Sequence, residues 1–200
     1  NDIYSDYKAN RSEAPDDLAP QFDYIRKSVL AFNLPSVDLL NYEADDLIAT
    51  YVEKILKSGA KVTIVSSDKD LMQLYKKGVR IFDPMKNKFI SEDDIFSKFG
   101  VDASKVIDVQ SLAGDSSDNV PGVPGIGVKT AAELINKYGT LEKLLKSAHE
   151  IKQNKRRETL IENKDKALIS KKLVTLMHDV PIERDLSEFK LKNIDKEKLY

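Results

Sequence analysis

The stretch from Asn119 to Ala132 reads Asn-Val-Pro-Gly-Val-Pro-Gly-Ile-Gly-Val-Lys-Thr-Ala-Ala. Its three glycines permit positive φ angles and let the backbone come close to a neighbouring group. The apolar residues between them can anchor the loop in a core, and a helix is expected to begin near Val128. This pattern indicates two helices joined by a tight glycine hairpin, the helix-hairpin-helix motif.

The start of the second helix is suited to binding a phosphate group. Free backbone N–H groups and the positive end of the helix dipole attract anions there, and Lys129 can add a charge. An ordinary Pro/Gly loop is one alternative; a nucleotide phosphate loop would need a longer spacer before Gly-Lys-Ser/Thr. We predict sequence-independent binding of a DNA backbone. The expected contact residues are Gly122, Val123, Gly125, Ile126, Gly127, Lys129 and Thr130.

The distribution of charge agrees with this prediction. A formal net charge of −1 argues at first against a nucleic-acid partner. Between Thr140 and Lys172, however, ten basic residues stand against five acidic ones. Such a run is usually a solvated helix surface, but beside a phosphate-binding hairpin it predicts a track for duplex DNA.

The composition excludes several other classes of protein. With no cysteine, the chain has no disulfide, no thiolate metal site and no cysteine nucleophile. No apolar run approaches the roughly 20 residues that span a bilayer, so we expect no membrane partner.

The pattern of predicted elements changes near Gly100. Before it, strand and helix signals alternate, which is typical of a parallel sheet flanked by helices, whereas after it the signals are helical. The predicted fold class is α/β followed by an all-helical region, with domains at 1–99 and 100–190 and a linker from 191 to 200. The expected strands are 36–40, 61–66, 79–82 and 88–90, and the expected helices are 16–33, 44–57, 71–75, 91–100 and 102–113.

Acidic residues gather at three points along these elements. The ends of successive parallel strands lie at one edge of a sheet, so the first two groups should converge. Clustered carboxylates repel each other unless a cation joins them, and oxygen-only ligands favour Mg²⁺ or Mn²⁺. Two such ions about 4 Å apart can promote in-line hydrolysis of a phosphodiester. The groups are Glu43, Asp45 and Asp46; Asp68 and Asp70; and Asp115 and Asp118.

Each acidic group also has a simpler explanation. The first can stabilise a helix N-terminus, the second can cap the helix that follows it, and the third can form turns in a Gly/Ser loop. All three explanations would have to hold independently, which favours the metal hypothesis. Spacing alone leaves both open.

The order of the motifs resembles one known family. Tyr-Lys-Ala-Asn-Arg begins at Tyr7, and Tyr-Glu-Ala-Asp-Asp, Ser-Ser-Asp-Lys-Asp-Leu and Gly-Asp-Ser-Ser-Asp-Asn follow before the glycine hairpin. In this order they resemble the 5′-nuclease domains of bacterial DNA polymerase I, in the flap-endonuclease family, over residues 3–185. The resemblance implies a PIN-like, resolvase-like core and a structure-specific 5′→3′ exonuclease or flap endonuclease.

The resemblance also implies a role for each candidate residue. Two Mg²⁺ or Mn²⁺ ions are the implied cofactors, and relatives carry a potassium ion at the hairpin. Tyr7, Lys8 and Arg11 match the base of the helical arch that grips the scissile phosphate. The first metal site corresponds to Glu43, Asp45 and Asp46, and the second to Asp68, Asp70, Asp115 and Asp118.

The implied partners are branched or nicked duplex DNA with a 5′ flap and hybrids of RNA primer with DNA. The implied form is a monomer at the N-terminal end of a longer polymerase chain, in the bacterial cytoplasm at the nucleoid. The family's first strands and two further aspartates precede Tyr7, so we expect a fragment starting at Asn1 to fold poorly or to lack flap cleavage with Mg²⁺. A non-catalytic module that binds the DNA backbone and a magnesium phosphatase for small molecules are the alternatives.

Overall fold

The computed structural model describes residues 3–198. These residues divide into two compact units. Unit 1 contains the opening segment up to Arg11 together with Ser58–Leu176, and unit 2 contains Ser12–Lys57 together with the residues from Met177 onward. This division differs from the predicted domain boundary near residue 100, which stays a prediction.

The sheet of unit 1 has three strands in the order β1-β2-β3. β1 (Val62–Val65) pairs in parallel with β2 (Val79–Asp83), and β3 (Lys88–Phe89) pairs antiparallel to β2 at the other edge. Ile64 and Ile81 lie opposite each other and are both buried, so one face of the sheet belongs to the core. The strands predicted at 61–66, 79–82 and 88–90 are therefore confirmed.

Short helices connect and follow these strands. From Gly100 on, unit 1 contains helices and one isolated bridge, between Asp115 and Val120, which agrees with the predicted helical region. The helices of unit 1 are η1 (Asp70–Leu74), α3 (Glu92–Phe99), η2 (Ala103–Lys105), α4 (Val106–Ala113), α5 (Val128–Tyr138), α6 (Leu141–Lys146), η3 (Ala148–Glu150), α7 (Asn154–Glu162) and α8 (Lys164–Val174).

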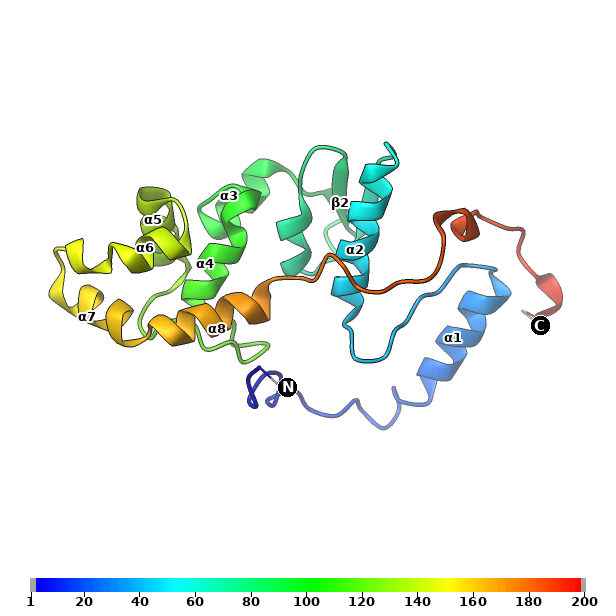
Figure 1. Cartoon of the computed structure of the whole chain (residues 1–200). Coiled ribbons are helices and arrows are strands. Elements are labelled where there is room, and N and C mark those ends of the chain that lie inside the picture. Colours follow the sequence, from blue (N-terminus) through cyan, green and yellow to red (C-terminus); the bar gives the residue numbers. More distant parts are fainter. Residues whose placement is uncertain (1–2, 199–200) are drawn as a thin grey trace. The chain divides into compact units, whose positions relative to one another are not determined.

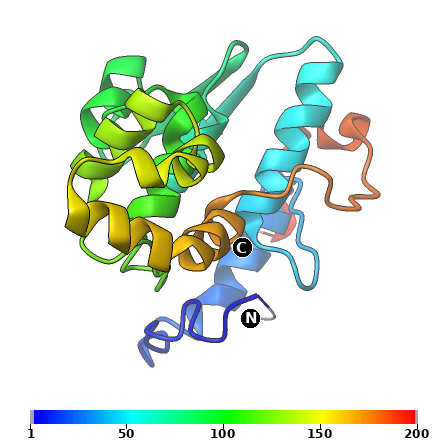
Figure 2. The same ribbon diagram turned by 60° about the vertical axis from the view of Figure 1, so that its left-hand side comes forward.

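Helix α4 is the centre of this helical region. It packs against both α5 and α8 (Figure 1 and Figure 2). Its Val109 and Leu112 are fully buried. A second contact is ionic, because Lys171 of α8 donates to Asp108 of α4 at 2.8 Å and to Glu142 of α6 at 2.6 Å. Apolar packing and this shared ammonium group together hold α4, α6 and α8 to one another.

The glycine hairpin between α4 and α5 is tightly packed at one end and open at the other. Gly122 has a φ of +59°, and a Cβ there would lie 2.5 Å from the backbone nitrogen of Gly114. Its N–H donates to the buried hydroxyl of Ser170 at 2.9 Å. Gly125 has a φ of +74°, but a Cβ there would meet nothing within 4 Å.

Helix α3 begins with a capping box. The Ser91 hydroxyl accepts from the Asp94 backbone N–H at 3.1 Å, and the Asp94 carboxylate accepts from the Ser91 N–H at 3.0 Å. The Lys88 ammonium lies 2.6 Å from the same carboxylate. The hydrogen bond from Lys88, followed by those from Ser91, lowers the pKa of Asp94 from 3.8 to about 2. Aspartate therefore takes the place of Glu or Gln, the usual residues at this position of a capping box.

Unit 2 contains two α-helices and two short 3₁₀ turns. They are α1 (Gln21–Ala31), α2 (Ala44–Lys57), η4 (Leu186–Phe189) and η5 (Lys196–Lys198). Helix α2 has the predicted bounds, whereas α1 begins five residues later than position 16 because Pro20 occupies its N-cap. Proline fits the first turn of a helix but breaks its interior, so the later start follows from its ring.

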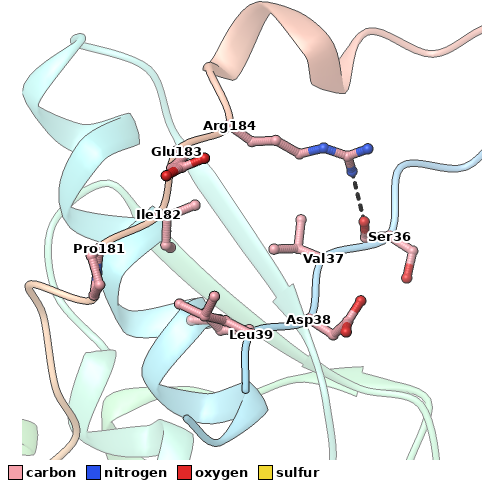
Figure 3. A pocket seen from close by; sticks show the side chains of 9 residues that line it. Ser36, Val37, Asp38, Leu39, Pro181, Ile182, Glu183 and Arg184 are labelled. Carbon is pink, nitrogen blue, oxygen red and sulfur yellow. Dashed lines mark hydrogen bonds between the residues drawn. The ribbon is translucent and has the colours of Figure 1, made fainter. Parts of the chain in front are cut away.

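The strand predicted at 36–40 is wrong. The segment forms no strand and is mostly exposed. Its apolar side chains instead face residues 181–184 across an open pocket of about 420 Å³, where Arg184 donates to the Ser36 carbonyl at 2.7 Å (Figure 3). A segment of five residues with three apolar side chains fits a strand or an extended loop equally well. Here contact with a distant extended segment favours the loop.

Among residues 3–198, none of the helices has the length and apolar character that crossing a membrane requires.

Removing the charge of Asp94 should reduce the loss of protein stability that occurs as pH falls in the acid range. A carboxyl with a lowered pKa stabilises the fold above its unfolded pKa and loses that contribution as pH falls through the folded value. We expect Asp94→Asn to lower the Tm at pH 7, and the difference from wild type to shrink as pH falls from 3.8 towards about 2. Thermal unfolding across this range measures it.

The exposed neighbour Asp93, in the same helical turn, supplies the control, and Asp93→Asn should lower the Tm less. A constant difference between Asp94→Asn and wild type from pH 7 to pH 2 would contradict the expectation.

Two alanine substitutions in the hairpin should differ in cost. In Gly125→Ala the added methyl group has open space around it. Its positive φ alone should therefore lower the free energy of unfolding, by about 1–2 kcal/mol. Gly122→Ala adds backbone overlap, worth about 1–3 kcal/mol more. Urea unfolding of the two variants measures the difference, and equal midpoints would disprove the packing described for Gly122.

Candidate metal and phosphate site

The opening segment lies against the loop that follows α4. The Lys8 backbone N–H donates to the Asp118 carbonyl at 2.9 Å. Two asparagines join the same segments, since Asn10 donates to the Ser116 carbonyl at 2.8 Å and Asn119 to the Asp6 carbonyl at 2.7 Å. These bonds connect residues more than a hundred positions apart in the chain. They bring the predicted phosphate-binding segment to a predicted metal ligand.

The contact between the two segments is also electrostatic. Arg11 donates to Asp118 Oδ1 at 2.6 Å, and Lys8 Nζ lies 3.8 Å from Asp118 Oδ2. The Lys8 ammonium also lies 4.8 Å from the centre of the Tyr7 ring. Two cations therefore gather around a single carboxylate, and one of them also contacts an aromatic ring.

Asp68 and Asp70 lie in the turn between β1 and η1. The Asp68 N–H donates to the Ser66 hydroxyl at 3.0 Å, and Asp68 Oδ1 accepts from the Asp70 N–H at 2.9 Å. Asp68 thus bonds the first residue of η1, although the N-cap of this turn is Lys69, which has no side-chain cap hydrogen bond. Asp70 Oδ1 accepts from the side-chain amide of Gln110 at 2.6 Å. Burial raises the pKa of Asp70, although this hydrogen bond opposes the shift.

Asp115 is the most buried carboxylate of the group, with a side chain that is 5% exposed. Its Oδ2 lies 2.5 Å from Lys69 Nζ, and its Oδ1 accepts from the Ser117 N–H at 2.9 Å. Burial tends to raise the pKa of Asp115, but these two donors outweigh burial and lower it. The side chain therefore remains an anion in a nearly closed environment.

Lys69 links the carboxylates of unit 1. Burial tends to lower the pKa of Lys69, but the charges of Asp115, Asp70 and Asp118 raise it overall. The pKa of Asp70 in turn responds to Asp68 and Asp115. The second and third acidic groups of the sequence therefore lie within electrostatic range of each other in one unit.

Within the described range 3–198, no three Asp, Glu, His or Cys side chains form a group that could hold a metal ion. The donor set nevertheless fits a hard divalent cation, because it is made of oxygen atoms alone. Lys69 supplies to Asp115 a positive charge of the kind that a metal ion would supply. The predicted ligands Asp68, Asp70, Asp115 and Asp118 supply such oxygen atoms, and their role in metal binding stays a prediction.

The first acidic group belongs to unit 2, at the start of α2. Asp46 Oδ1 accepts from the Met177 N–H at 2.8 Å, and its Oδ2 lies 3.4 Å from the Glu43 nitrogen. Asp45 and Asp46 are in the first turn of the helix, where acidic side chains are stabilised by the dipole. A metal-binding role for Glu43, Asp45 and Asp46 stays a prediction.

The predicted contact residues of the hairpin separate into two kinds. Val123 and Ile126 are buried and anchor the loop, and the Gly122 N–H is used inside the protein. The exposed residues are Gly125, Gly127 and Lys129, with Thr130 half-exposed beside them. Since Gly127 is the N-cap of α5, the exposed part includes the end of the helix that favours anions.

Two residues at this site escaped the sequence analysis. Lys69 stands between two predicted ligands, and a basic residue inside an acidic motif is the signal that could have identified it. Gln110 is a polar residue within the largely apolar sequence of α4, but nothing in the local pattern predicts its contact with Asp70.

Family models match the chain along nearly its whole length. Residues 1–100 match the N-terminal resolvase-like domain of 5′-3′ exonucleases, and residues 101–197 match their C-terminal SAM fold. DNA polymerase I of Rhizobium leguminosarum is 55% identical over 185 residues, which are 92% of this chain and 18% of that protein. The 5′-3′ exonuclease of Aquifex aeolicus (strain VF5) is 40% identical over 197 residues, 98% of this chain and 67% of that protein.

Solved structures show the same fold. The T5 5′-exonuclease with bound zinc has a TM-score of 0.76 at 24% identity, covering 86% of this chain and 68% of that one. A T5 flap endonuclease complex with DNA and metal ions has a TM-score of 0.74 at 23% identity, with the same coverage. The predicted fold class, a resolvase-like α/β core followed by a helical region, is confirmed.

Replacing Lys69 should destabilise the metal-free protein. Lys69→Met leaves the Asp115 carboxylate nearly buried with only Ser117 as a described donor, which should cost about 1–3 kcal/mol. Denaturant unfolding with a chelator present measures the loss.

Lys86→Met is a matched control, because Lys86 pairs with another buried carboxylate, that of Asp83. Asp83 also accepts from Ser67 and from two backbone N–H groups, so this control should cost less than about 1 kcal/mol. Equal losses in the two variants would contradict the role assigned to Lys69.

Proposed function

We propose that this chain, which belongs to the 5′-3′ exonuclease family, is a structure-specific 5′ nuclease that hydrolyses DNA phosphodiesters with two divalent metal ions. The chain spans 18% and 23% of the DNA polymerase I proteins of Rhizobium leguminosarum and Bacillus caldotenax. The nuclease would then be one part of a longer polymerase. Its core would be residues 1–99, and its duplex-binding region would be residues 100–190.

One observation supports the proposal above the others: cations and carboxylates meet in unit 1. Arg11 and Lys8 form ion pairs with Asp118. Lys69 forms an ion pair with Asp115 and lies within electrostatic range of Asp70. A phosphodiester needs positive charge to bind, while hydrolysis by metal ions needs oxygen ligands within reach of the same phosphate. A purely DNA-binding module would have no use for the buried carboxylates.

The residues of the opening segment would act on the phosphate itself. Arg11 has a side chain that is 58% exposed, so its guanidinium can exchange Asp118 for a phosphate oxygen. Arginine binds phosphate in a fork of two parallel hydrogen bonds, which fixes orientation as well as charge. Lys8 would add a second positive charge, and the Tyr7 ring offers a face on which a base can stack.

Divalent ions, Mg²⁺ or Mn²⁺, would activate the attacking water and stabilise the leaving oxygen when bound. Unit 1 would hold one of them through Asp68, Asp70, Asp115 and Asp118. The ligands proposed for the other ion are Glu43, Asp45 and Asp46.

The exposed side of the hairpin would hold the duplex. N–H groups at the start of α5 and the ammonium group of Lys129 would contact phosphates of the backbone without reading sequence. A potassium ion bound at the hairpin, as the family resemblance implies, would add to this contact. The substrates would be duplexes with a 5′ flap or a nick and RNA primers on DNA, cut by a monomer at the bacterial nucleoid.

Asp115→Asn should abolish cleavage and spare binding. The amide keeps the size of the side chain and can still accept from Ser117, but it weakens a metal ligand. Loss of an outer partner of a ligand costs up to about 100-fold, so loss of the ligand itself should cost more. Single-turnover cleavage of a 5′-flap substrate with Mg²⁺, by the full-length protein, measures the rate.

Duplex affinity measured in parallel with Ca²⁺ or a chelator should stay within about twofold of wild type, since the proposed phosphate contacts are Arg11, Lys8 and the hairpin and not the buried Asp115 side chain. The exposed change Asp93→Asn serves as the control and should cleave like wild type. Normal cleavage by Asp115→Asn would overturn the proposal, and equal loss of binding and cleavage would point to misfolding or to the binding-module alternative.

A further inference from the structure

Gln110 is a buried polar residue that the proposed reaction does not yet use. It lies on α4 between the apolar residues Val109 and Leu112, and it is 4% exposed. A buried amide costs free energy unless its hydrogen-bonding groups find partners. Its neighbour Ser111 is equally enclosed, but its hydroxyl is satisfied within the helix by the Ile107 carbonyl at 2.6 Å.

The amide of Gln110 is directed at Asp70. Its Nε2 donates to Asp70 Oδ1 at 2.6 Å, a short distance that is typical of a hydrogen bond to a charged acceptor. An ionised carboxylate only accepts, so the nitrogen of the amide must face it. Within residues 3–198, Gln110 is the one side chain described as donating to the Asp70 carboxylate.

The other half of the amide is left without a partner. Gln110 Oε1 is buried and accepts no hydrogen bond from the described part of the chain. A core residue whose only purpose was packing would be an apolar side chain of the same volume, since this would avoid an unsatisfied acceptor. One end of the amide is thus bound to a carboxylate, and the other end has no partner among the described residues.

We propose that Gln110 is a positioning residue for Asp70 in metal binding. Its Nε2–H holds Oδ1 of the carboxylate, which fixes the side-chain rotamer and leaves Oδ2 for a divalent ion. Its Oε1 accepts from a water molecule that enters with the ion. The inference rests on the proposed function, because it assigns Asp70 as a ligand. Partners of ligands commonly orient them in this way, and their loss costs 10–100-fold in affinity.

A double-mutant cycle with a direct metal readout tests this assignment. Gln110→Met keeps the volume and the helical preference of the side chain but removes the donor, and Gln110→Leu is a second variant of the same kind. Calorimetric titration of the full-length protein with Mn²⁺ should show roughly 10-fold weaker binding for both. Ser111→Ala, which removes a buried hydroxyl one residue away, should bind Mn²⁺ like wild type.

The cycle distinguishes a loss of Asp70 positioning from a general loss of protein stability in Gln110→Met. In a protein that already carries Asp70→Asn, adding Gln110→Met should weaken Mn²⁺ binding no further. Raising the Mn²⁺ concentration should restore flap cleavage by Gln110→Met towards the wild-type rate, whereas a merely destabilised protein would not recover.

Wild-type affinity for Mn²⁺ in Gln110→Met and Gln110→Leu would overturn the inference and leave the proposed function intact. An equal loss in the Asp70→Asn background would also overturn it. Failure of the wild-type protein to bind Mn²⁺ at all would overturn the proposed function together with the inference.

Discussion

Two glycine backbones pass each other too closely for a side chain on either. A Cβ on Gly114 would lie 2.6 Å from the Val120 carbonyl oxygen, and a Cβ on Gly122 would lie 2.5 Å from the Gly114 nitrogen. This contact closes the loop between them and fixes residues 115–120 at the end of α4. The same loop carries Asp115 and Asp118, and the exposed hairpin continues from it. Two candidate metal ligands and the candidate phosphate contacts of the hairpin therefore depend on one steric constraint.

The carboxylates around this loop share a second constraint, which is electrostatic. The acidic side chains of this part of unit 1 have cations or amide groups as partners. Lys69 pairs with Asp115, Arg11 donates to Asp118, and the Gln110 amide donates to Asp70. Without such partners, the charges would repel each other, and burial would favour the neutral forms. On the proposed function, a phosphate would replace Asp118 at Arg11 and a metal ion would replace Lys69 at Asp115, whereas Gln110 would keep its bond to Asp70. The charges of these carboxylates are therefore balanced by partners within unit 1.

Where the structure departs from expectation, the cause is contact over distance. Residues 36–40 have the composition of a short strand, yet they lie as a loop beside residues 181–184. Asp68 accepts a hydrogen bond from the first residue of η1, and its role as a metal ligand stays a prediction. The sequence around Gln110 gives no sign of its contact with Asp70, because the two residues are 40 positions apart.

The sequence by itself determined the elements that rest on local signals. The capping box at Ser91 and Asp94, the strand Val62–Val65 and the glycine hairpin are each encoded within a few neighbouring residues, so spacing and residue type suffice to predict them. It also identified the acidic residues. Only the tertiary structure decided which cation pairs with which carboxylate. Arg11 and Asp118 are 107 positions apart and meet only when the opening segment packs on the loop after α4. A side-chain pair of that kind has no periodicity to read, and the packed chain alone brings it within hydrogen-bonding distance.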